Sequence, residues 1–510
     1  MKKYWTQILN SSKTEVSRHK LTYTTLFLLL IAAFVIRVYR TFDLMGFYYD
    51  QGRDALVIWD LWHNYKPFLI GPITGLKGIY LGPLYYYLIA PFYLIGRGNP
   101  VYPAVFLAFL SVVAILLLYV VGARMHSRAA GIIAAIIASF SYSIFTASRW
   151  LSNPTPVLLT SIVYLWSLWE IASNNSKLYG WWITAVLMIG LSMQFESASA
   201  VFYIPIFIIF CLWQWKKIPK FKYILTAGLI FLATLVPQLI FNFRHDNILL
   251  ANFGSLFINE KAFGQGLTDF IIAERSKLIW RVFASRILVE TSRRVLIYYT
   301  ISLSMLFILP SRSKKTIVIL FSIFLLVPIV SYYLFQGNYG NIYDYYLTGY
   351  YLPIVLLFAI GMGELLKRKW GFLVVALFLL AFFKSNLPAI RNYLTANHQT
   401  RPISLSDEVY AVDWIYDDAL KTYEKFNATI YVPPVIPYAY DYLFLWRGTI
   451  KCGTSMCGKT DRETSIFYTL YEPENVHTDR FIEWMTNIEQ SSKEIASEKF
   501  GQITVEKRQK

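Results

Sequence analysis

The feature that most constrains this chain is a series of apolar segments that recurs from Leu21 to Phe383. Each is roughly 16–22 residues long, enough for a helix to cross a hydrocarbon core about 30 Å thick. Lipid offers the backbone no hydrogen-bond partner, so a spanning segment must satisfy its own polar groups, as an α-helix does. Only 15% of the residues are charged, against about 25% in soluble domains. The sequence therefore predicts a polytopic α-helical membrane protein.

Twelve segments have this composition, and twelve spans give an unfavourable charge distribution. The five Lys and Arg residues before Leu21 favour a cytoplasmic N-terminus. Twelve spans would then place the basic loops 124–128, 216–222 and 312–315 outside, against the positive-inside rule. The segments are 21–39, 81–96, 102–122, 129–147, 155–172, 180–195, 198–215, 223–243, 295–310, 316–335, 346–366 and 370–384.

Segment 81–96 differs from the others because it contains two prolines and five Tyr or Phe residues. We expect it to form a kinked hairpin in the membrane interface rather than a span. Every later loop then changes side, and about eleven spans remain, with the C-terminus outside. The basic loops that become cytoplasmic lie at Arg124, Lys177, Lys216, Arg312 and Lys367.

This topology divides the chain into three parts in the cell (plasma) membrane. Residues 1–20 form a cytoplasmic N-terminus, residues 21–385 a transmembrane domain, and residues 386–510 an extracytoplasmic domain. Two large loops, 40–101 with interfacial helices and 244–294, lie outside. The tail is predicted as a small α/β domain, with helices near 405–423 and 479–490 and strands near 428–432, 465–470 and 501–505.

The net charge of +17 would indicate nucleic-acid binding in a soluble protein. Here the basic residues flank apolar spans, so we interpret them as a topology signal and as contacts to anionic membrane lipid, with no nucleic-acid partner. Cys452 and Cys457 could form a disulfide if the tail is extracytoplasmic. Cys211 lies in an apolar span, where core packing explains it.

Asp50 is the strongest catalytic candidate. It follows the first span in the segment GFYYDQGRDALVIWD, and a carboxylate beside the membrane surface, next to Tyr49, suits a general base. Asp54 lies four residues on, so both carboxylates would share one face of a helix. The alternative is that Asp50 caps a helix that begins near Gly52.

Other polar residues lie near the predicted outer surface. Asn153, before Pro154, is a natural helix N-cap, and this role leaves room for a contact to a substrate hydroxyl. Glu196 is an acid in an apolar hairpin, for which a functional role and a turn are equally good explanations. Asp344 and Tyr345 lie among tyrosines that suit either sugar rings or an interfacial belt.

Basic residues on the outer stretch 269–294 could bind a lipid phosphate through charge-assisted hydrogen bonds. The alternative is a plain interfacial helix on lipid headgroups. These residues are Arg275, Lys277, Arg281, Arg286, Arg293 and Arg294. Further phosphate candidates near the first loop are Arg53, Lys77 and Arg149.

Metal and nucleotide motifs are not found in the sequence. The six His residues do not occur in HxxxH or HExxH spacing, and there is no P-loop. We therefore expect no cofactor and a donor already activated on a lipid, while the use of a divalent metal stays open.

The motifs together resemble those of C-fold membrane glycosyltransferases, in particular the protein O-mannosyltransferase and aminoarabinose transferase group. The resemblance covers about residues 20–450. It rests on YYDQGRDA around Asp50, GPLYYYL at 82–88, the stretch 124–159, and YDYYLTGYYLP at 343–353.

This resemblance implies an inverting transferase that uses a polyprenyl-phosphate sugar and a protein, lipid or glycan acceptor. Asp50 matches the family's catalytic aspartate and would deprotonate the acceptor hydroxyl. Arg or Lys would meet the charge of the departing polyprenyl phosphate. The segment 81–96, with Tyr85, matches the juxtamembrane helices that wall the cavity.

The chain departs from the family pattern at three places. Gln51 follows Asp50 where Asp-Glu is common, so a second acid would have to be Asp54. Asn153-Pro154 stands where Asp-Pro is frequent, and Asn cannot act as a base. Leu81-Gly82-Pro83 replaces a common His-Pro-Pro. Asp50 would therefore act alone, with Asp54 or with Glu196.

Other functions remain to be weighed. A transporter or flippase would need polar residues at mid-membrane, and the centres of these spans are nearly uncharged. A membrane glycan polymerase or ligase would share the lipid donor and differ in the size of its product. A sensor that uses the tail as a ligand domain is a further alternative.

Overall fold

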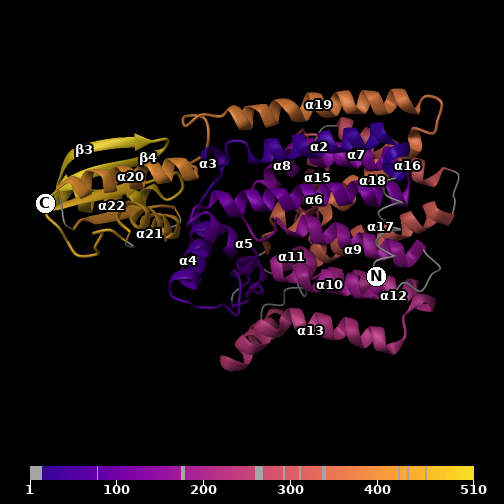
Figure 1. Ribbon diagram of the computed structural model, residues 1–510, viewed down its shortest axis with the longest axis horizontal. Coiled ribbons are helices and arrows are strands. Elements are labelled where there is room, and N and C mark those ends of the chain that lie inside the picture. The colour runs from indigo at the N-terminus through magenta and orange to yellow at the C-terminus, as the bar shows by residue number, and fades with distance from the viewer. Residues whose placement is uncertain are drawn as a thin grey trace.

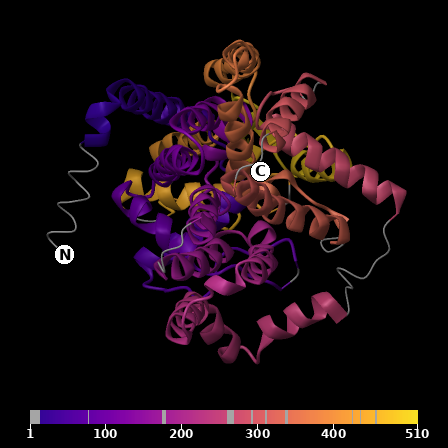
Figure 2. The ribbon, with the colours of Figure 1, turned by 90° about the vertical axis from the view of Figure 1, so that its right-hand side faces the viewer.

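The computed structural model describes residues 14–76, 78–173, 179–258, 268–290, 293–308, 312–335, 340–422, 425–433, 436–453 and 456–510. Long helices run side by side in a bundle, and a small domain with a sheet lies beyond one end of it (Figure 1). Figure 2 looks along the bundle and shows many of its helices end-on. The predicted combination of a helical bundle and a small C-terminal α/β domain is confirmed.

Among the described residues, six helices are long and apolar enough to cross a membrane, or up to seven if the bent pair α7 and α8 forms one span. The six are α2 (Lys20–Val38), α6 (Val101–Met125), α13 (Phe221–Arg244), α17 (Arg312–Leu334), α18 (Thr348–Leu365) and α19 (Gly371–Thr395). Shorter bundle helices are α7 (Arg128–Phe140), α8 (Tyr142–Ser148), α9 (Val157–Ser173), α10 (Gly180–Phe195), α11 (Ser197–Ala200), α12 (Tyr203–Trp213) and α16 (Arg293–Phe307).

The connections carry further short helices. They are α3 (Thr41–Leu44), α4 (Tyr49–His63), α5 (Leu84–Ile95), η1 (Trp215–Lys217), α14 (Ile248–Ile258), α15 (Asp269–Ser285) and η3 (Asp344–Leu347).

Segment 81–96 is one helix, α5, with Pro91 inside it, so the predicted hairpin was wrong. The chain reverses just before α5 instead. The Gly71 amide donates to the Leu81 carbonyl (2.8 Å), and the Leu81 amide donates to the Pro72 carbonyl (2.9 Å). Gly82 and Pro83 thus mark a turn at the N-terminal border of the apolar segment, while Pro91 is accommodated within the helix.

The predicted span 129–147 is broken into α7 and α8, which meet at an angle of 66°. Ser141 between them has an extended backbone (ψ 121°). Asn386 of α19 stabilises the break, because its side-chain oxygen accepts a hydrogen bond from the Tyr142 amide (2.9 Å) and its nitrogen donates to the Ile287 carbonyl (3.0 Å). A distant side chain therefore replaces the helical hydrogen bond that is lost.

The loops predicted to be cytoplasmic lie together at one end of the bundle. Glu364 is contacted there by Lys314 (2.8 Å) and Lys367 (2.9 Å), and by His126 (2.8 Å). Arg124 pairs with Glu170 (2.6 Å). The amine of Lys217 reaches the carbonyls of Ile171 and Ala172 nearby. These contacts connect the basic loops with one another. The predicted topology, in which 81–96 does not span the membrane, places the same loops on one side.

The first loop and the C-terminal domain meet at the opposite end, where α3, α4 and α5 lie between bundle and domain (Figure 1). The Arg40 guanidinium donates to the Leu394 carbonyl (2.9 Å), and the Leu405 amide donates to the Met45 carbonyl (2.9 Å). Asp50 therefore lies at the end away from the basic loops.

The C-terminal domain has a four-stranded sheet of order β1-β2-β4-β3, in which β1 and β2 are parallel and the other pairs antiparallel. Its elements are α20 (Leu405–Thr422), β1 (Asn427–Tyr431), α21 (Tyr438–Cys452), β2 (Ile466–Tyr471), α22 (Thr478–Ser491), β3 (Lys493–Phe500) and β4 (Ile503–Gln509). Five of these were predicted within a few residues of their bounds, whereas α21 and β3 were not. Helix α21 contacts neighbours on several sides, and β3 is almost wholly exposed, so neither shows a clear apolar period.

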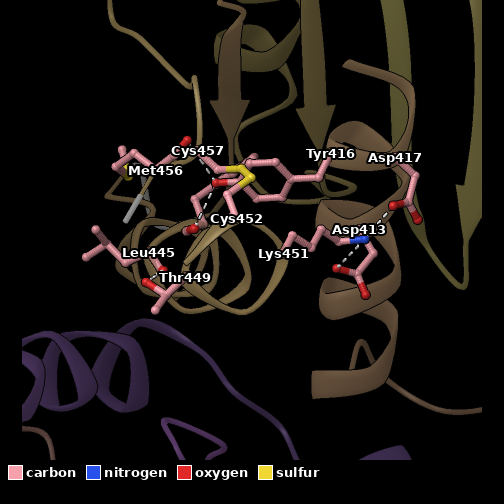
Figure 3. The surroundings of a disulfide bond; sticks show 10 residues. Asp413, Tyr416, Asp417, Leu445, Thr449, Lys451, Cys452, Met456 and Cys457 are labelled. Carbon is pink, nitrogen blue, oxygen red and sulfur yellow. Dashed lines mark hydrogen bonds and ion pairs between the residues drawn. A yellow bond between two sulfur atoms is a disulfide. The ribbon is translucent and has the colours of Figure 1, made fainter. Parts of the chain in front are cut away.

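A disulfide joins Cys452, at the end of α21, to Cys457 (Figure 3). Beside it, the Tyr416 hydroxyl of α20 donates to the carbonyls of Phe444 (2.9 Å) and Met456 (3.2 Å). The disulfide thus lies where α20 and α21 meet. Cys211 is a half-buried residue of α12.

The grouping of the loops predicts opposite accessibility for two engineered cysteines. In a Cys211→Ser background, we expect Thr400→Cys to react with a membrane-impermeant maleimide in intact cells. Lys220→Cys should react only after the membrane is permeabilised. Both positions are exposed in the structure. Labelling of Lys220→Cys from outside would contradict the topology.

Candidate active site

Asp50 lies in the first turn of α4 with its carboxylate open to solvent. Its side chain is 58% exposed, and among the described residues its ion-pair partner is Arg53 (2.8 Å). The helix starts one residue earlier, and the Tyr48 amide donates to the side-chain oxygen of Gln51 (3.1 Å). The Gln51 side chain therefore caps the start of α4. The alternative in which Asp50 is the N-cap was wrong.

Arg53 also contacts Asp54, so the two carboxylates share one face of α4 as the spacing predicted. The Arg53 Nη2 atom lies 2.7 Å from Asp54 Oδ1, and the Tyr86 hydroxyl donates to the same oxygen (3.0 Å). Burial raises the pKa of Asp54 to about 6, although Arg53 and the Tyr86 hydrogen bond oppose this rise. Tyr85, the predicted neighbour, is buried beside Tyr86.

Loops that are far apart in the sequence meet around Asp50. The Gln51 side chain donates to the Leu151 carbonyl (3.1 Å). The Asn153 side chain donates to the Phe195 carbonyl (2.6 Å). The first bond joins the first loop to the segment that precedes α9. The second bond joins this segment to the end of α10. The predicted site residues of three loops thus lie at one surface.

Asn153 and Glu196 both have structural roles, and that of Asn153 differs from the predicted helix N-cap. Helix α9 begins only at Val157, so Asn153 does not cap it and instead fixes the end of α10. Glu196 is buried and accepts hydrogen bonds from the Ala198 and Ser199 amides at the start of α11. Its carboxylate is occupied by a helix N-terminus, which favours the turn interpretation.

A cavity of about 620 Å³ lies beside these loops, between α8, α15 and the segment that leads into α18. It is lined by two arginines, one acid, hydroxyl groups and aromatic rings. The residues used below are Trp150, Arg281, Arg286, Asp344, Tyr345 and Tyr351.

Two arginines of the cavity carry unused donors. Arg286 is buried, its guanidinium lies 3.7 Å from the centre of the Tyr351 ring, and its Nε donates to the Val282 carbonyl (3.0 Å). Neither terminal amino group of Arg286 has a hydrogen-bond partner in the described part of the chain, and the same holds for the exposed Arg281. The cavity therefore offers an anion at least one fixed, partly desolvated cation.

The other predicted phosphate ligands lie elsewhere. Arg275 donates to the Gly340 carbonyl, and Lys277 pairs with Glu274 (2.8 Å). Arg149 is buried and donates to the carbonyls of Ile36 (2.9 Å) and Arg37 (2.7 Å) at the end of α2. Lys77 lies outside the described residues.

Aromatic rings and an acid line the cavity opposite these cations. The rings of Trp150 and Tyr345 are 5.6 Å apart in an edge-to-face arrangement. Asp344 is exposed, and its carboxylate has no partner among the described residues. Gln51, the neighbour of Asp50, donates to the Leu151 carbonyl, and Leu151 follows Trp150 of the cavity wall, so the first turn of α4 lies near the cavity. Trp150 was not predicted, although its position in SRWLSNP, before Asn153, was a usable signal.

No group of three or more His, Cys, Asp and Glu residues that could hold a metal ion occurs within the described ranges. The side chains of this site can supply proton transfer at Asp50 and electrostatic stabilisation of an anion at Arg281 and Arg286.

Comparison with known proteins supports the resemblance seen in the sequence. Residues 81–241 match the family model of dolichyl-phosphate-mannose-protein mannosyltransferases. The structure aligns with ArnT from Cupriavidus metallidurans bound to undecaprenyl phosphate over 95% of this chain and 98% of that one, with a TM-score of 0.59 and 11% identity. Apo ArnT aligns over the same shares with a TM-score of 0.58 and 10% identity.

AglB from Archaeoglobus fulgidus, an archaeal oligosaccharyltransferase, aligns over 87% of this chain and 64% of that one, with a TM-score of 0.47 and 13% identity. The sequence matches no curated protein significantly. The chain thus has the fold of ArnT, and both the predicted fold class and the predicted resemblance to C-fold membrane glycosyltransferases are confirmed.

The buried carboxylate of Asp54 predicts a pH-dependent stability. Its pKa is higher in the folded protein than in the unfolded chain, so the folded state binds the proton more tightly. The free energy of unfolding should therefore fall by about 3 kcal/mol as pH rises from about 3 to about 7. Asp54→Asn should remove this fall, as measured by chemical unfolding in detergent, whereas Asp60→Asn on the same helix should keep it. An unchanged pH profile in Asp54→Asn would show that Asp54 is ionised throughout.

Proposed function

We propose that this protein transfers a sugar from a polyprenyl-phosphate donor to an acceptor hydroxyl, with inversion at the anomeric carbon. One observation carries the proposal: an open carboxylate, Asp50, lies in the helical turn that is hydrogen-bonded to Leu151, next to the cavity residue Trp150, and Arg286 presents unused donors in the same cavity. The match of 81–241 to a mannosyltransferase family model and the fold shared with ArnT, solved with undecaprenyl phosphate bound, support it.

Asp50 is the proposed general base. Its carboxylate takes the proton of the acceptor hydroxyl while the oxygen forms a bond to the anomeric carbon. The bond between this carbon and the phosphate oxygen breaks, and polyprenyl phosphate leaves with the electron pair. A single displacement of this kind inverts the anomeric centre. The Arg53 guanidinium forms ion pairs with both Asp50 and Asp54 on one face of α4.

Arg281 and Arg286 are the proposed phosphate ligands. Negative charge grows on the leaving phosphate during the displacement, and fixed donors aimed at it lower the barrier. The position of Arg286 is set by Tyr351 and Val282 before any ligand binds, so little reorganisation is required. Trp150 and Tyr345 offer rings to a sugar face, and the free carboxylate of Asp344 offers an acceptor for sugar hydroxyls.

The reaction is proposed to occur on the outer face of the membrane. The C-terminal domain, which lies at the same end as Asp50, contains the disulfide between Cys452 and Cys457. Disulfides persist in oxidising compartments, so this domain belongs outside the cytoplasm. The acceptor is a protein, a lipid or a glycan, and the assay below distinguishes these classes by product.

Loss of the base should abolish most of the activity. We expect Asp50→Asn to lower the rate of polyprenyl phosphate release by about 10²–10⁴-fold, and Asp60→Asn, an exposed acid further along α4, to lower it less than about twofold. Purified protein in lipid is supplied with a panel of radiolabelled polyprenyl-phosphate sugars and native membrane extract as acceptor. If wild type releases no polyprenyl phosphate under these conditions, the proposal fails and transport becomes the better explanation.

Loss of the buried cation should weaken donor use. We expect Arg286→Gln to reduce kcat/KM for the donor by about 10–100-fold, the worth of one hydrogen bond to a charged group. Lys277→Gln in α15, the helix that Arg286 follows, is the matched control, because its amine pairs with Glu274 outside the cavity. Equal donor kinetics in both variants would place the phosphate elsewhere.

A further inference from the structure

The helix that carries Asp50 packs on the C-terminal domain as closely as on the bundle. Helices α4 and α21 run against each other, with the Tyr49 and Tyr438 rings 4.9 Å apart at one end and the Trp59 and Tyr442 rings 6.0 Å apart further along. Toward the bundle, α4 has the Gln51 hydrogen bond and its contacts with α5. The position of Asp50 thus depends on two partners.

Gly52 is where α4 and α21 come closest. A Cβ atom at Gly52 would lie 2.3 Å from the Ala439 nitrogen and 2.4 Å from the Tyr438 carbonyl carbon. Both are backbone atoms, so no side-chain rotation could relieve the collision. Gly52 is two residues from Asp50, and the absence of its side chain lets the first turn of α4 rest directly on the first turn of α21.

The domain holds the rest of the first loop as well. The Tyr48 hydroxyl donates to the Ile403 carbonyl (2.8 Å). At the far end of the loop, the Trp446 indole donates to the Arg97 carbonyl (2.9 Å) and the Tyr442 hydroxyl donates to the Gly98 carbonyl (2.5 Å). Both ends of the loop are therefore bonded to the C-terminal domain.

Tyr438 is the residue of the C-terminal domain that lies next to the proposed base. It opens α21, it is half-buried, and its ring packs on Tyr49, the neighbour of Asp50. An acceptor hydroxyl must come within hydrogen-bond distance of the Asp50 carboxylate to lose its proton. The molecule that carries this hydroxyl would therefore lie against the Tyr49–Tyr438 pair.

We propose that the C-terminal domain completes the active site, with α21 positioning Asp50 through the contact at Gly52 and Tyr438 lining the approach of the acceptor. This inference rests on the proposed function. It assigns the donor to the cavity between α8, α15 and α18, and the acceptor to the junction of the first loop with the domain. A domain that only covered the bundle would affect stability but would leave acceptor use unchanged.

The acceptor role is tested with Tyr438→Ala in the full-length protein. We expect the amount of native membrane extract needed for half-maximal transfer to rise about threefold to tenfold, the worth of one aromatic contact. The kcat and the affinity for undecaprenyl phosphate alone should stay within about twofold, because the ring lies outside the donor cavity. An unchanged requirement for extract, or an equal loss of undecaprenyl phosphate binding, would overturn the proposal.

The positioning role is tested with Gly52→Ala. We expect kcat to fall about tenfold or more, since small displacements of a catalytic group are costly, with unchanged binding of undecaprenyl phosphate. Amide hydrogen exchange across 49–63 should become faster. Gly228→Ala is the matched control, because no heavy atom lies within 4 Å of its added Cβ.

The exchange and binding measurements separate this inference from the proposed function. Absence of polyprenyl phosphate release by wild type would contradict the function, while the exchange of α4 in Gly52→Ala would still report on the contact. If Gly52→Ala does not fold, the result for Tyr438→Ala decides. Normal exchange and normal kcat in a folded Gly52→Ala protein would contradict the positioning role.

Discussion

The site depends on the backbone contact between α4 and α21 at Gly52. A larger residue would separate the two helices and move Asp50 with them, because Gly52, Arg53 and Asp50 occupy one helical turn. The same turn carries Gln51, whose hydrogen bond to Leu151 joins it to the bundle. One turn of helix thus connects the two parts of the protein, and the carboxylate proposed to act as base lies on the side left open by both.

Buried arginines stabilise the ends of helices, a role that their charge alone does not indicate. Arg37 donates to the carbonyls of Ala138 and Ser139 at the end of α7, and Arg149 donates to those at the end of α2. Helix C-termini expose unpaired carbonyls and partial negative charge, which a guanidinium satisfies well. These two residues hold the broken pair α7 and α8 against α2, and α8 forms one wall of the cavity. Arg286 differs because its carbonyl contact uses only Nε, which leaves its terminal groups for a ligand.

This arrangement suits the proposed function, because it offers one surface to the proposed donor and another to the proposed acceptor. The cations of the cavity suit the phosphate of a lipid donor, and the cavity is lined by bundle segments, among them α15 and the start of α18. Asp50 lies in the helical turn that is bonded to Leu151, next to Trp150 of the cavity, and the C-terminal domain contacts the same first loop. An enzyme that joins a lipid-linked sugar to a second molecule needs such an arrangement, because both substrates must reach one carboxylate from different sides.

The amino-acid sequence by itself determined the helical membrane class, the grouping of the basic loops and the placement of Asp50 and Asp54 on one face of a helix. These properties follow from local quantities: the length of apolar segments, the distribution of Lys and Arg, and the spacing of two carboxylates on a helix. The tertiary structure decided which polar side chains have hydrogen-bond partners in the described part of the chain and which do not. Asn153, Glu196 and Arg149 bind backbone groups brought near them by packing, and the break at Ser141 requires Asn386, far along the chain. Helix α21 also escaped prediction, because burial on several sides removes the polar face that reveals a helix. A hydrogen-bond partner that is distant in the sequence leaves no local sequence pattern. Only the folded chain therefore shows whether a charged side chain is bonded within the protein or is available to bind a ligand.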